Sequence, residues 1–377
     1  MSANLQTIAC SASCIAIVCT VVGLSAPALR TAEFPQKHFW VDVNGLFVRM
    51  TGRVLCNERL MYSKRVIGLR YEGWKWSAMK ERAGRVTAFA AALRERGMPF
   101  LYVQAPNKID LRNELPPVGW SGTNPNEKAC EFVRLLEAGG VHTLNLVPEL
   151  ATSGDDVVRN FYRTDHHWTF RTALRAARGI ADELAGVLSE PALKGHSLLR
   201  EDSWEWRRLD RWFLGSDGRR VGRLFAGLDD LEYCVPGFPT ELRRVYENGV
   251  ESRGTFEDVE MNRSRLSAPC LFDVNGFDAI GNGARVLRHL NEKAPFRERI
   301  IVLNDSFGHP VCSFLSTLFR EVVQVNPRKF EPPDSVQGLV FDFRPNAVVE
   351  LLCATSIVNP KFKYEFLKSD GDEEVDR

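Results

Sequence analysis

The sequence predicts an α/β fold in which a parallel sheet is covered by helices on both faces. Short apolar segments at residues 100–104, 299–303 and 321–325 have the length and composition of buried strands. Helical patterns of about 10 to 15 residues alternate with such segments. This alternation is typical of βαβ units, whose strands run parallel and are buried on both faces.

The individual elements follow from the spacing of apolar side chains and from stop signals. The helix over 82–96 carries Val86, Phe89 and Leu93 at helical spacing, and Gly97 supplies its stop. In chain order we then expect a strand over 100–104, a helix over 127–137, a strand over 143–147, a helix over 170–184, a strand over 299–303, a helix from Gly308 that carries Leu318 and Phe319 on its apolar stripe, and strands over 321–325 and 346–352.

Residues 201–283 interrupt this alternation, and we interpret the segment as an insertion. The segment is rich in Trp, Arg, Gly and Asp and has weak periodicity, so we expect irregular or short β structure. An insertion over the carboxyl edge of the sheet would be well placed to shape a substrate cleft. Trp204, Trp206 and Trp212 could stack on sugar rings there or pack into a core.

The amino end predicts an export signal or a membrane anchor. No charged side chain occurs from Met1 to Leu29, and the apolar part is close to the roughly 20 residues of a bilayer-spanning helix. Ala26-Pro27-Ala28 offers a cleavage pattern, so a cleaved signal and an uncleaved anchor both stay open. We expect a lead over 1–30, one domain over 31–368, and a solvated acidic tail over 369–377.

The overall charge excludes a partner recognised by bulk electrostatics. Lys and Arg total 49 and Asp and Glu total 48, which leaves no field that would attract nucleic acid or an anionic membrane. A neutral or sugar-like partner is compatible with this balance. Nucleic acid is therefore not expected as a partner.

The cysteines do not form a recognisable metal or redox motif. No C-x-x-C pair occurs, which excludes a zinc-knuckle or thioredoxin-like interpretation. Disulfides and buried free thiols both remain open for the six cysteines beyond the lead, namely Cys56, Cys130, Cys234, Cys270, Cys312 and Cys353.

Two adjacent histidines precede the helix predicted over 170–184. Thr169 is a candidate N-cap of that helix, so Asp165, His166 and His167 lie in the loop that enters it. A hydroxyl nucleophile needs an imidazole to accept its proton and a carboxylate to orient the imidazole. Asp165 and His167 are two residues apart, so a single loop can turn both side chains inward.

Ser306 is the candidate nucleophile. The apolar strand over 299–303 is followed by Asn304-Asp305-Ser306 and then by a helix, which places Ser306 at the edge of the sheet. Backbone N–H groups at the start of that helix could stabilise an oxyanion. Asp305 and Ser306 could instead only cap the helix, a frequent role of these residue types.

These two motifs together resemble the DHHW branch of the SGNH-hydrolase superfamily, which contains the alginate O-acetylation proteins. The resemblance rests on Thr-Asp-His-His-Trp-Thr at 164–169 and on Asp-Ser-Phe-Gly at 305–308, with support from 41–47, 213–216 and 227–230. It spans roughly residues 35–360. It implies a flavodoxin-like sheet with Asp165 as orienting acid, His167 as general base and Ser306 as nucleophile, whereas His166 is not the base.

The sequence departs from the family pattern before the serine. Asn304 stands where glycine is usual, and Asn is the next most tolerant residue of a left-handed backbone, which keeps the turn feasible. The superfamily's separate oxyanion donors have no clear match. Asn275-Gly276 and Gly281-Asn282-Gly283 are candidates, although both are typical of plain turns.

The resemblance implies acetyl transfer through an acetyl-serine to an extracellular polysaccharide, with a membrane-bound O-acyltransferase as donor partner and no cofactor. The location implied is the cell envelope. Three alternatives stay open: a carbohydrate esterase, a non-catalytic glycan-binding protein, and a metal-dependent phosphoesterase that uses Asp165, His166 and His167 as ligands. The last would need further Asp and His clusters, and the remaining histidines occur singly.

Overall fold

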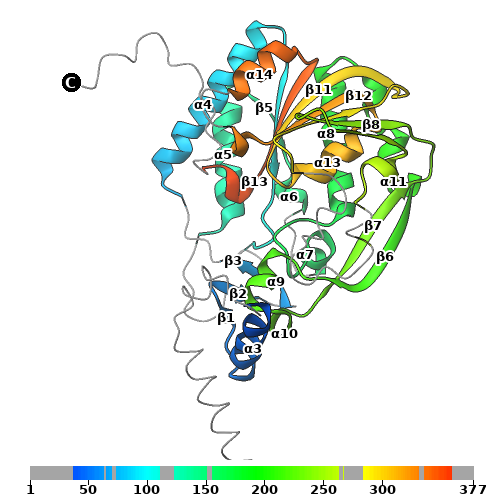
Figure 1. Ribbon diagram of the computed structural model, residues 1–377. Coiled ribbons are helices and arrows are strands. Elements are labelled where there is room, and N and C mark those ends of the chain that lie inside the picture. Colours follow the sequence, from blue (N-terminus) through cyan, green and yellow to red (C-terminus); the bar gives the residue numbers. More distant parts are fainter. Residues whose placement is uncertain are drawn as a thin grey trace, which may run out of the picture.

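A central eight-stranded sheet organises the molecule (Figure 1). The computed structural model describes residues 37–62, 65–69, 74–110, 123–150, 155–262, 266, 283–330 and 335–358. The strand order is β5-β4-β13-β11-β12-β10-β8-β9. These strands are β4 (Phe100–Ala105), β5 (His142–Asn145), β8 (Leu242–Tyr246), β9 (Glu251–Gly254), β10 (Val286–Leu290), β11 (Phe296–Asn304), β12 (Phe319–Val325) and β13 (Ala347–Cys353).

The sheet is mostly parallel. β5, β4, β13, β11 and β12 run parallel to one another, which confirms the expected α/β class. One edge of the sheet is antiparallel, because β10 pairs antiparallel with β12 and with β8, and β8 pairs antiparallel with β9. β8 and β9 are short and rich in charged residues, as is usual at a sheet edge, and so lack the apolar runs of the central strands.

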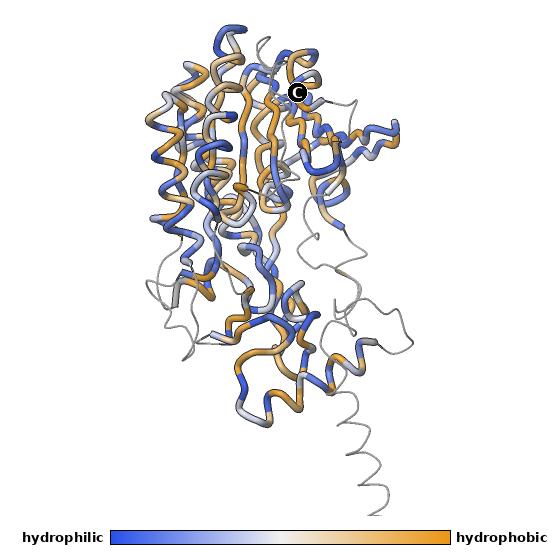
Figure 2. The backbone as a smooth tube through the Cα atoms, turned by 90° about the vertical axis from the view of Figure 1, so that its left-hand side faces the viewer, coloured by the Kyte–Doolittle hydropathy of each residue, from blue (hydrophilic) through white to orange (hydrophobic). Residues whose placement is uncertain are grey.

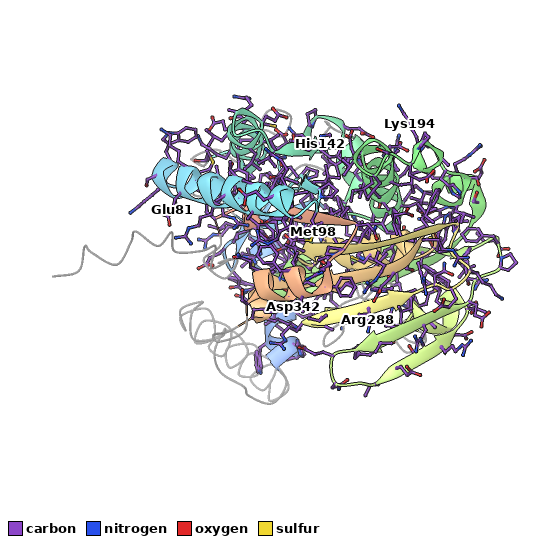
Figure 3. All side chains as sticks on the ribbon, turned by 90° about the horizontal axis from the view of Figure 1, so that it is seen from above. Glu81, Met98, His142, Lys194, Arg288 and Asp342 are labelled. Atoms are coloured by element: carbon purple, nitrogen blue, oxygen red, sulfur yellow. The ribbon has the colours of Figure 1, made fainter. Side chains whose placement is uncertain are left out.

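Helices cover both faces of the sheet. α4 (Trp76–Glu95), α5 (Pro125–Ala138) and α14 (Val336–Phe343) pack on one face, and α8 (Phe170–Val187) and α13 (Gly308–Leu315) pack on the other. Seen from above, Glu81 of α4 and Asp342 of α14 mark helices of the first group, and side chains fill the space between helices and sheet (Figure 3).

Alternate side chains of each central strand enter the core on opposite faces of the sheet. In β11, Ile300 and Val302 belong to the cluster under α8 and α13, whereas Ile301 and Leu303 belong to the cluster under α4 and α5. All four side chains are completely buried. The hydrophobic colour along the central strands in Figure 2 reflects this burial on both faces, which explains why these strands could be predicted.

Several predicted boundaries were wrong. α13 ends at Leu315, and Phe319 begins β12 instead of continuing the helix. The end of α13 and the start of β12 are both buried, so the spacing of apolar residues could not show where the helix ends and the strand begins. Val147 begins the short helix α6 (Val147–Leu150) and does not lie in β5. α4 begins at Trp76, earlier than its apolar spacing indicated.

A small unit lies below the carboxyl edge of the sheet (Figure 1). It contains α3 (Lys37–Met50), the sheet of β1 (Leu55–Cys56), β2 (Arg59–Met61) and β3 (Ile67–Leu69), and the helices α9 (Ser216–Val221) and α10 (Arg223–Ala226). Phe225 and Val221 form its core with Ile67 and Cys56. Asp42 joins α3 to α10 because its carboxylate accepts hydrogen bonds from the backbone N–H and the Nε of Arg223, at 2.6 and 2.8 Å.

Part of the predicted insertion belongs to the core. β6 (Trp204–Phe213) and β7 (Asp229–Pro236) form a hairpin, and Trp204 is buried against Phe256 and Phe314 at ring distances of 5.1 and 5.0 Å. Packing in a core, not stacking on sugar, is therefore the observed role of Trp204. The remaining short elements are α7 (Asp155–Asn160), α11 (Phe256–Val259) and 3₁₀ turns at Pro191–Leu193, Ser197–Leu199, Glu201–Ser203, Pro327–Lys329 and Ala354–Ser356.

The predicted lead over 1–30 and the acidic tail over 369–377 lie outside the described residues. Within the described part of the chain, no helix combines the length and the apolar character that crossing a membrane requires. Cys270 also lies outside it. The other cysteines beyond the lead are free thiols, namely Cys56, Cys130, Cys234, Cys312 and Cys353.

Candidate active site

Ser306 lies in the turn between β11 and α13. Asp305 fixes this turn, because its Oδ2 accepts from the backbone N–H of Cys353 at 2.8 Å and its Oδ1 accepts from that of Phe307 at 3.0 Å. Asp305 is buried and thereby ties the turn to the neighbouring strand β13. The Ser306 side chain stays partly exposed. The turn thus presents a hydroxyl at the carboxyl edge of the sheet.

Asn304 is accommodated without a left-handed backbone. It is the last residue of β11 and pairs with Leu351, and neither Asn304 nor Ser306 is among the described residues with positive φ. Instead, the turn requires a small residue at Gly308. A Cβ at Gly308 would lie 2.4 Å from the Cβ of Asn304. The glycine of this turn therefore follows the serine.

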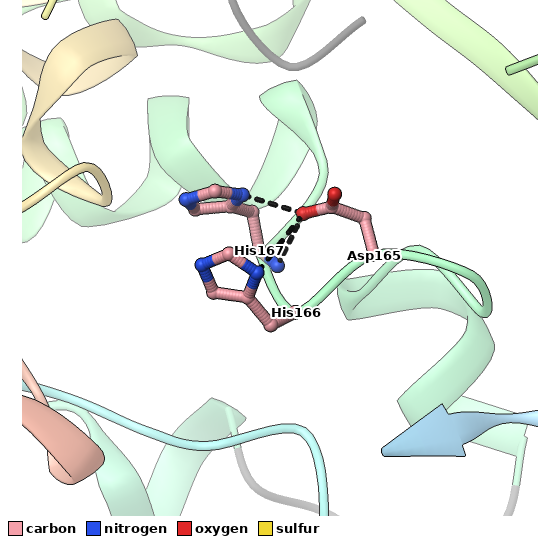
Figure 4. A group of neighbouring side chains, drawn as sticks. All are labelled: Asp165, His166 and His167. Atoms are coloured by element: carbon pink, nitrogen blue, oxygen red, sulfur yellow. Dashed lines mark hydrogen bonds and ion pairs between the residues drawn. The ribbon is translucent and has the colours of Figure 1, made fainter. Parts of the chain in front are cut away.

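Asp165 and His167 form a hydrogen-bonded pair in the loop between α7 and α8 (Figure 4). The Oδ1 of Asp165 is 2.5 Å from His167 Nδ1 and also accepts from the His167 backbone N–H at 3.0 Å. Thr169 caps α8 by accepting from the N–H of Thr172, as its sequence position predicted. The loop therefore enters α8 with both side chains turned inward.

His167 reaches Ser306 across the sheet edge. Its Nε2 is 2.6 Å from Ser306 Oγ, although 139 residues separate the two in sequence. With Nδ1 donating to the Asp165 carboxylate, Nε2 is left to accept the Ser306 hydroxyl proton. The structure thus brings together Asp165, His167 and Ser306, the three residues proposed from the sequence. The arrangement is suited to activating a hydroxyl for attack on a carbonyl carbon.

Asp165 is ionised at neutral pH. Burial alone would raise its pKa, but the charges of His167 and His166, together with hydrogen bonds from His167 and from the Ser216 backbone, hold the pKa well below its usual value. The Ser216 N–H donates to Oδ2 at 2.6 Å. Both carboxylate oxygens therefore have donors, which fixes the carboxylate behind the imidazole.

His166 lies beside the pair and contacts a different partner. Its Nδ1 is 2.7 Å from Ser216 Oγ, and its ring centroid is 3.8 Å from that of His167. Burial of the ring among its neighbours and the charge of His167 lower the pKa of His166 to about 4, although 44% of its side chain remains exposed. His166 is therefore neutral at pH 7 and is directed to Ser216 instead of Ser306.

The stretches 213–216 and 227–230 support the loop from behind. Asp229 Oδ2 accepts from the backbone N–H and the hydroxyl of Thr164, both at 2.7 Å. Gly215 donates its N–H to Thr164 Oγ1 at 2.9 Å. A Cβ at Gly215 would lie 2.3 Å from the Cβ of Asp165, so only glycine fits. The insertion thus supplies contacts that hold the acid of the pair.

A buried lysine that the sequence analysis did not identify also holds this loop. Lys108 Nζ donates to the backbone oxygens of Asp165 at 2.7 Å and Arg163 at 3.2 Å. Its charge is balanced by Asp217 Oδ2 at 3.1 Å, and Arg59 Nε donates to Asp217 Oδ1 at 2.6 Å. The only signal in the sequence is the position of Lys108 just after the carboxyl end of β4, where site residues of such sheets gather.

Ser306 itself offers a donor for an oxyanion. The Ser306 backbone N–H has no acceptor among the described residues and is therefore a candidate donor to an oxyanion. Of the candidate turns, Asn275-Gly276 and Gly281-Asn282 lie outside the described residues. A Cβ at Gly283 would lie 3.0 Å from the ring of His309, which is buried.

The metal-binding alternative involves the same loop. Ligand atoms of Asp165, His166 and His167 lie within 4.8 Å of one another, the one such three-residue group in the described part of the chain. Asp165 Oδ1, however, already accepts from His167 Nδ1. An ion bound between these two atoms would replace that hydrogen bond.

Part of the chain matches a known protein family. Residues 70–205 match the profile of a family described as SGNH hydrolase-like domain, acetyltransferase AlgX. The resemblance to the SGNH hydrolase-like acetyltransferases is confirmed. The matched range contains Asp165 and His167 and ends before Ser306. The match supports an enzyme that acts on acyl groups. Among curated proteins, none matches the chain.

Solved structures with this fold cover most of this chain. PatB1 of Bacillus cereus is 16% identical with a TM-score of 0.64, covering 80% of this chain and 98% of PatB1. A structure of PatB1 with a sulfonyl adduct is 15% identical with a TM-score of 0.64, covering 82% of this chain and 100% of the other. A DHHW family protein from Eubacterium siraeum is 15% identical with a TM-score of 0.55, covering 81% and 94%. At these identities the similarity establishes the fold alone.

Proposed function

We propose that the chain is a serine-dependent O-acetyltransferase that modifies an extracellular polysaccharide, with Ser306 as nucleophile, His167 as general base and Asp165 as orienting acid. The observation that carries this proposal is the 2.6 Å contact between Ser306 Oγ and His167 Nε2, with Asp165 on the other ring nitrogen. The acetyltransferase family profile matched by residues 70–205 supports acetyl as the acyl group.

The reaction proceeds in two halves. His167 Nε2 takes the Ser306 proton while Ser306 Oγ attacks the carbonyl carbon of an acetyl ester, the bond to the donor oxygen breaks, and His167 returns the proton to that oxygen. A sugar hydroxyl then attacks the acetyl-serine carbonyl and gives its proton to His167. Ser306 Oγ leaves and recovers this proton, so the enzyme is regenerated and no cofactor is consumed.

Asp165 acts through His167. Its ionised carboxylate holds the imidazole in the tautomer with the proton on Nδ1 and stabilises the imidazolium that forms in each half-reaction. The N–H of Ser306, in the turn before α13, is the donor we propose for the oxyanion. Acetyl transfer with these groups needs no metal ion.

The direct test is detection of the intermediate. The purified protein is incubated with an activated acetyl ester such as p-nitrophenyl acetate, digested and analysed by mass spectrometry. We expect an acetyl group on the peptide that contains Ser306, and none on that peptide in the Ser306→Ala variant. Acetylation that is confined to surface lysines in both proteins would contradict the proposal.

A carbohydrate esterase is the second candidate, because it shares the acetyl-serine and differs only in having water as the second nucleophile. Released acetate and acetylated glycan should be measured side by side in one preparation. A transferase positions its acceptor, and such positioning can be worth on the order of 10⁵ M in effective concentration, enough to outcompete water at about 55 M. Acetate release with every acceptor glycan offered, without transfer, would favour the esterase. Absence of both activities would favour a non-catalytic glycan-binding protein.

We also propose that the catalytic domain works outside the cytoplasm, in the cell envelope. The uncharged segment over 1–29 supports export or anchoring. A membrane-bound O-acyltransferase would then supply the acetyl group to Ser306 from the membrane side. Fractionation of cells that express a full-length tagged protein, followed by protease accessibility in spheroplasts, tests this location. Protection from protease until the membrane is broken would contradict it.

A further inference from the structure

The small unit that contains α3 exposes an apolar surface. α3 lies at the end of this unit that is farthest from the central sheet (Figure 1). Six of the eleven large hydrophobic side chains that are exposed in the described part of the chain fall within residues 39–55, namely Phe39, Leu46, Phe47, Met50, Val54 and Leu55. Single exposed apolar side chains are ordinary, whereas a concentration of them in one place indicates an interaction surface.

α3 has two faces, and only one of them packs on the rest of the unit. Val41, Asp42 and Gly45 are buried, and a Cβ at Gly45 would collide with the backbone oxygen of Val221 in α9. The opposite side of the helix carries five apolar residues at helical spacing, which we call the outer face of α3: Phe39, Val43, Leu46, Phe47 and Met50. The core of the small unit therefore does not account for these five residues.

The border of the outer face is basic. Within residues 37–54 the only acidic residue is Asp42, which is buried. Arg49 and Arg53 are exposed, and Arg49 Nη1 donates to the backbone oxygen of Leu224 at 3.1 Å. This hydrogen bond holds the Arg49 guanidinium beside the helix. The border of the outer face is therefore suited to anionic groups.

Trp40 also borders the outer face. Its side chain is half-buried and packs edge-on against Phe39, with ring centroids 5.3 Å apart. Tryptophan is enriched where proteins meet the headgroup region of a bilayer, because its ring is apolar and its N–H is polar. α3 thus has the composition of a helix that lies along a bilayer surface, with an apolar face and basic residues at its border.

The chain enters α3 from the uncharged amino-terminal segment. That segment ends at Leu29, and α3 begins at Lys37. The residues between them, 30–36, span at most about 25 Å when fully extended, at roughly 3.6 Å per residue. If the uncharged segment is inserted in a membrane, the start of α3 is therefore held close to the lipid surface.

We propose that the outer face of α3 docks on the surface of a lipid bilayer that contains anionic phospholipids. The inference goes beyond acetyl transfer and rests on the proposed location at the cell envelope. A second copy of the chain fits this face less well, because a two-fold contact would bring two basic borders into one interface. A bilayer instead supplies phosphate groups for Arg49 and Arg53 and an apolar layer for Phe47 and Met50.

The docked helix is connected to the proposed active site. α3 packs on α9, and Asp217 of α9 pairs with Lys108 at 3.1 Å. Lys108 in turn donates to the backbone oxygen of Asp165 at 2.7 Å. Docking of α3 would therefore set the orientation of the carboxyl edge of the sheet, and of Ser306, relative to the membrane.

The test measures whether lipid reaches the outer face of α3 in the full-length protein. The protein is reconstituted in nanodiscs of phosphatidylcholine and phosphatidylglycerol whose acyl chains are brominated, which quenches a fluorophore that contacts them. A fluorescent amino acid introduced by stop-codon suppression replaces Phe47 in one sample and Val250 in the matched control. Val250 is 57% exposed and lies in the turn between β8 and β9, away from α3.

We expect several-fold quenching of the probe at position 47 and none at position 250. Leu46→Glu combined with Met50→Glu should reduce the quenching at position 47 to the control level. Both side chains are exposed, so the fold should persist, which thermal unfolding of the variant checks. Nanodiscs of phosphatidylcholine alone should quench less, and equal quenching there would contradict the role of Arg49 and Arg53.

Absence of quenching at position 47 would overturn the inference, because a second copy or the amino-terminal segment would then cover the face. Quenching that persists after both glutamate substitutions would also overturn it, since proximity to the bilayer alone would explain the signal. No turnover is measured, so this result is independent of acetyl-serine formation at Ser306. The two proposals are therefore tested separately.

Discussion

The hydroxyl of Ser306 lies 2.6 Å from Nε2 of His167, a contact between a strand end and a helix entry that are 139 residues apart. The contact depends on two turns that are held independently, one by Asp305 and the other by Thr164 and Asp229. Each turn is fixed by buried hydrogen bonds before any substrate is present. Such prior positioning is what activation of a hydroxyl nucleophile requires.

Removing the nucleophile should abolish turnover, whereas changing the neighbouring histidine should not. We expect Ser306→Ala to lower kcat with p-nitrophenyl acetate by on the order of 10⁴-fold, the scale of a lost triad member. His166→Asn keeps a hydrogen-bonding group toward Ser216 and should retain most of the activity. Initial rates of both variants measure this. Equal losses in the two variants would assign His166 a direct role in the reaction and contradict its proposed role as a neighbour of the pair.

Gly215 should be essential because of its contact with Asp165. In Gly215→Ala, the new methyl group would meet the Asp165 Cβ and backbone at 2.3 to 2.6 Å, which forces the loop to move. Such overpacking costs about 1 to 3 kcal/mol of the free energy of unfolding and should displace His167 from Ser306. The matched control is Gly84→Ala in the middle of α4, where a Cβ meets nothing within 4 Å.

The two glycine variants should therefore change stability in opposite directions. Gly84→Ala should raise the free energy of unfolding by roughly 0.5 to 1 kcal/mol and leave kcat unchanged. Urea unfolding and acetyl-ester kinetics on the same preparations separate the two effects. A Gly215→Ala protein with normal activity would show that Asp165 tolerates displacement.

The lowered pKa of Asp165 makes stability depend on pH in a defined direction. A carboxyl group with a folded-state pKa below its unfolded value stabilises the fold above the unfolded pKa of about 3.9 and loses this contribution as the pH falls through the folded pKa. The free energy of unfolding of the wild type should thus exceed that of Asp165→Asn at pH 7 and at pH 5. The difference should shrink only in unfolding measurements below about pH 4. A difference that already vanishes at pH 5 would contradict the low pKa.

The sequence predicted the elements whose apolar pattern is uninterrupted. β4, β11, β12 and β13 are buried on both faces, so their composition alone identifies them. β8 and β9 escaped prediction because they lie at the charged edge of the sheet and bury little apolar surface. Their place in the sheet is set by pairing with β10, a contact between segments distant in sequence.

The same distinction applies to the site. Asp165 and His167 belong to one short local motif, and Ser306 follows a recognisable strand, so all three could be proposed from the sequence. Lys108 could not, because its partner Asp217 is 109 residues away and lysine is rarely buried unless it is paired. The role of Gly215 depends on its close contact with Asp165, which is distant in sequence, and the spacing of residues along the chain does not reveal such a contact.

Chelation distinguishes the acid–base pair from a metal site. If Asp165 and His167 act as a hydrogen-bonded pair, extended dialysis against EDTA should leave the rate of acetyl-ester cleavage unchanged. A metal held by Asp165, His166 and His167 would instead be needed for activity and would be removed by the chelator. Activity that is lost in EDTA and restored by manganese would favour the metal-dependent phosphoesterase, with these residues as metal ligands.

The helix α13, which begins two residues after the proposed nucleophile, is anchored by a buried ionic cluster at its other end. Glu260 is completely buried among Ser313 of α13 at 2.7 Å, His289 Nδ1 at 2.7 Å and Arg244 at 2.5 Å. Burial on its own would raise the pKa of Glu260, but the charges of Arg244 and His289 hold it well below the usual value, so the carboxylate is ionised. The cluster joins α13 to β8 and β10 of the sheet.

Neutralising Glu260 should therefore destabilise the protein strongly, because Glu260→Gln leaves the Arg244 charge buried without a counterion. Breaking one side of such a pair costs about 3 to 5 kcal/mol of the free energy of unfolding. Glu257→Gln is the matched control, since Glu257 lies one turn earlier, is 38% exposed and makes only a 3.6 Å contact with Arg207. Its effect should stay within about 0.5 kcal/mol. Urea unfolding of both variants measures the difference, and equal values would show that α13 is held by its apolar packing without help from the cluster.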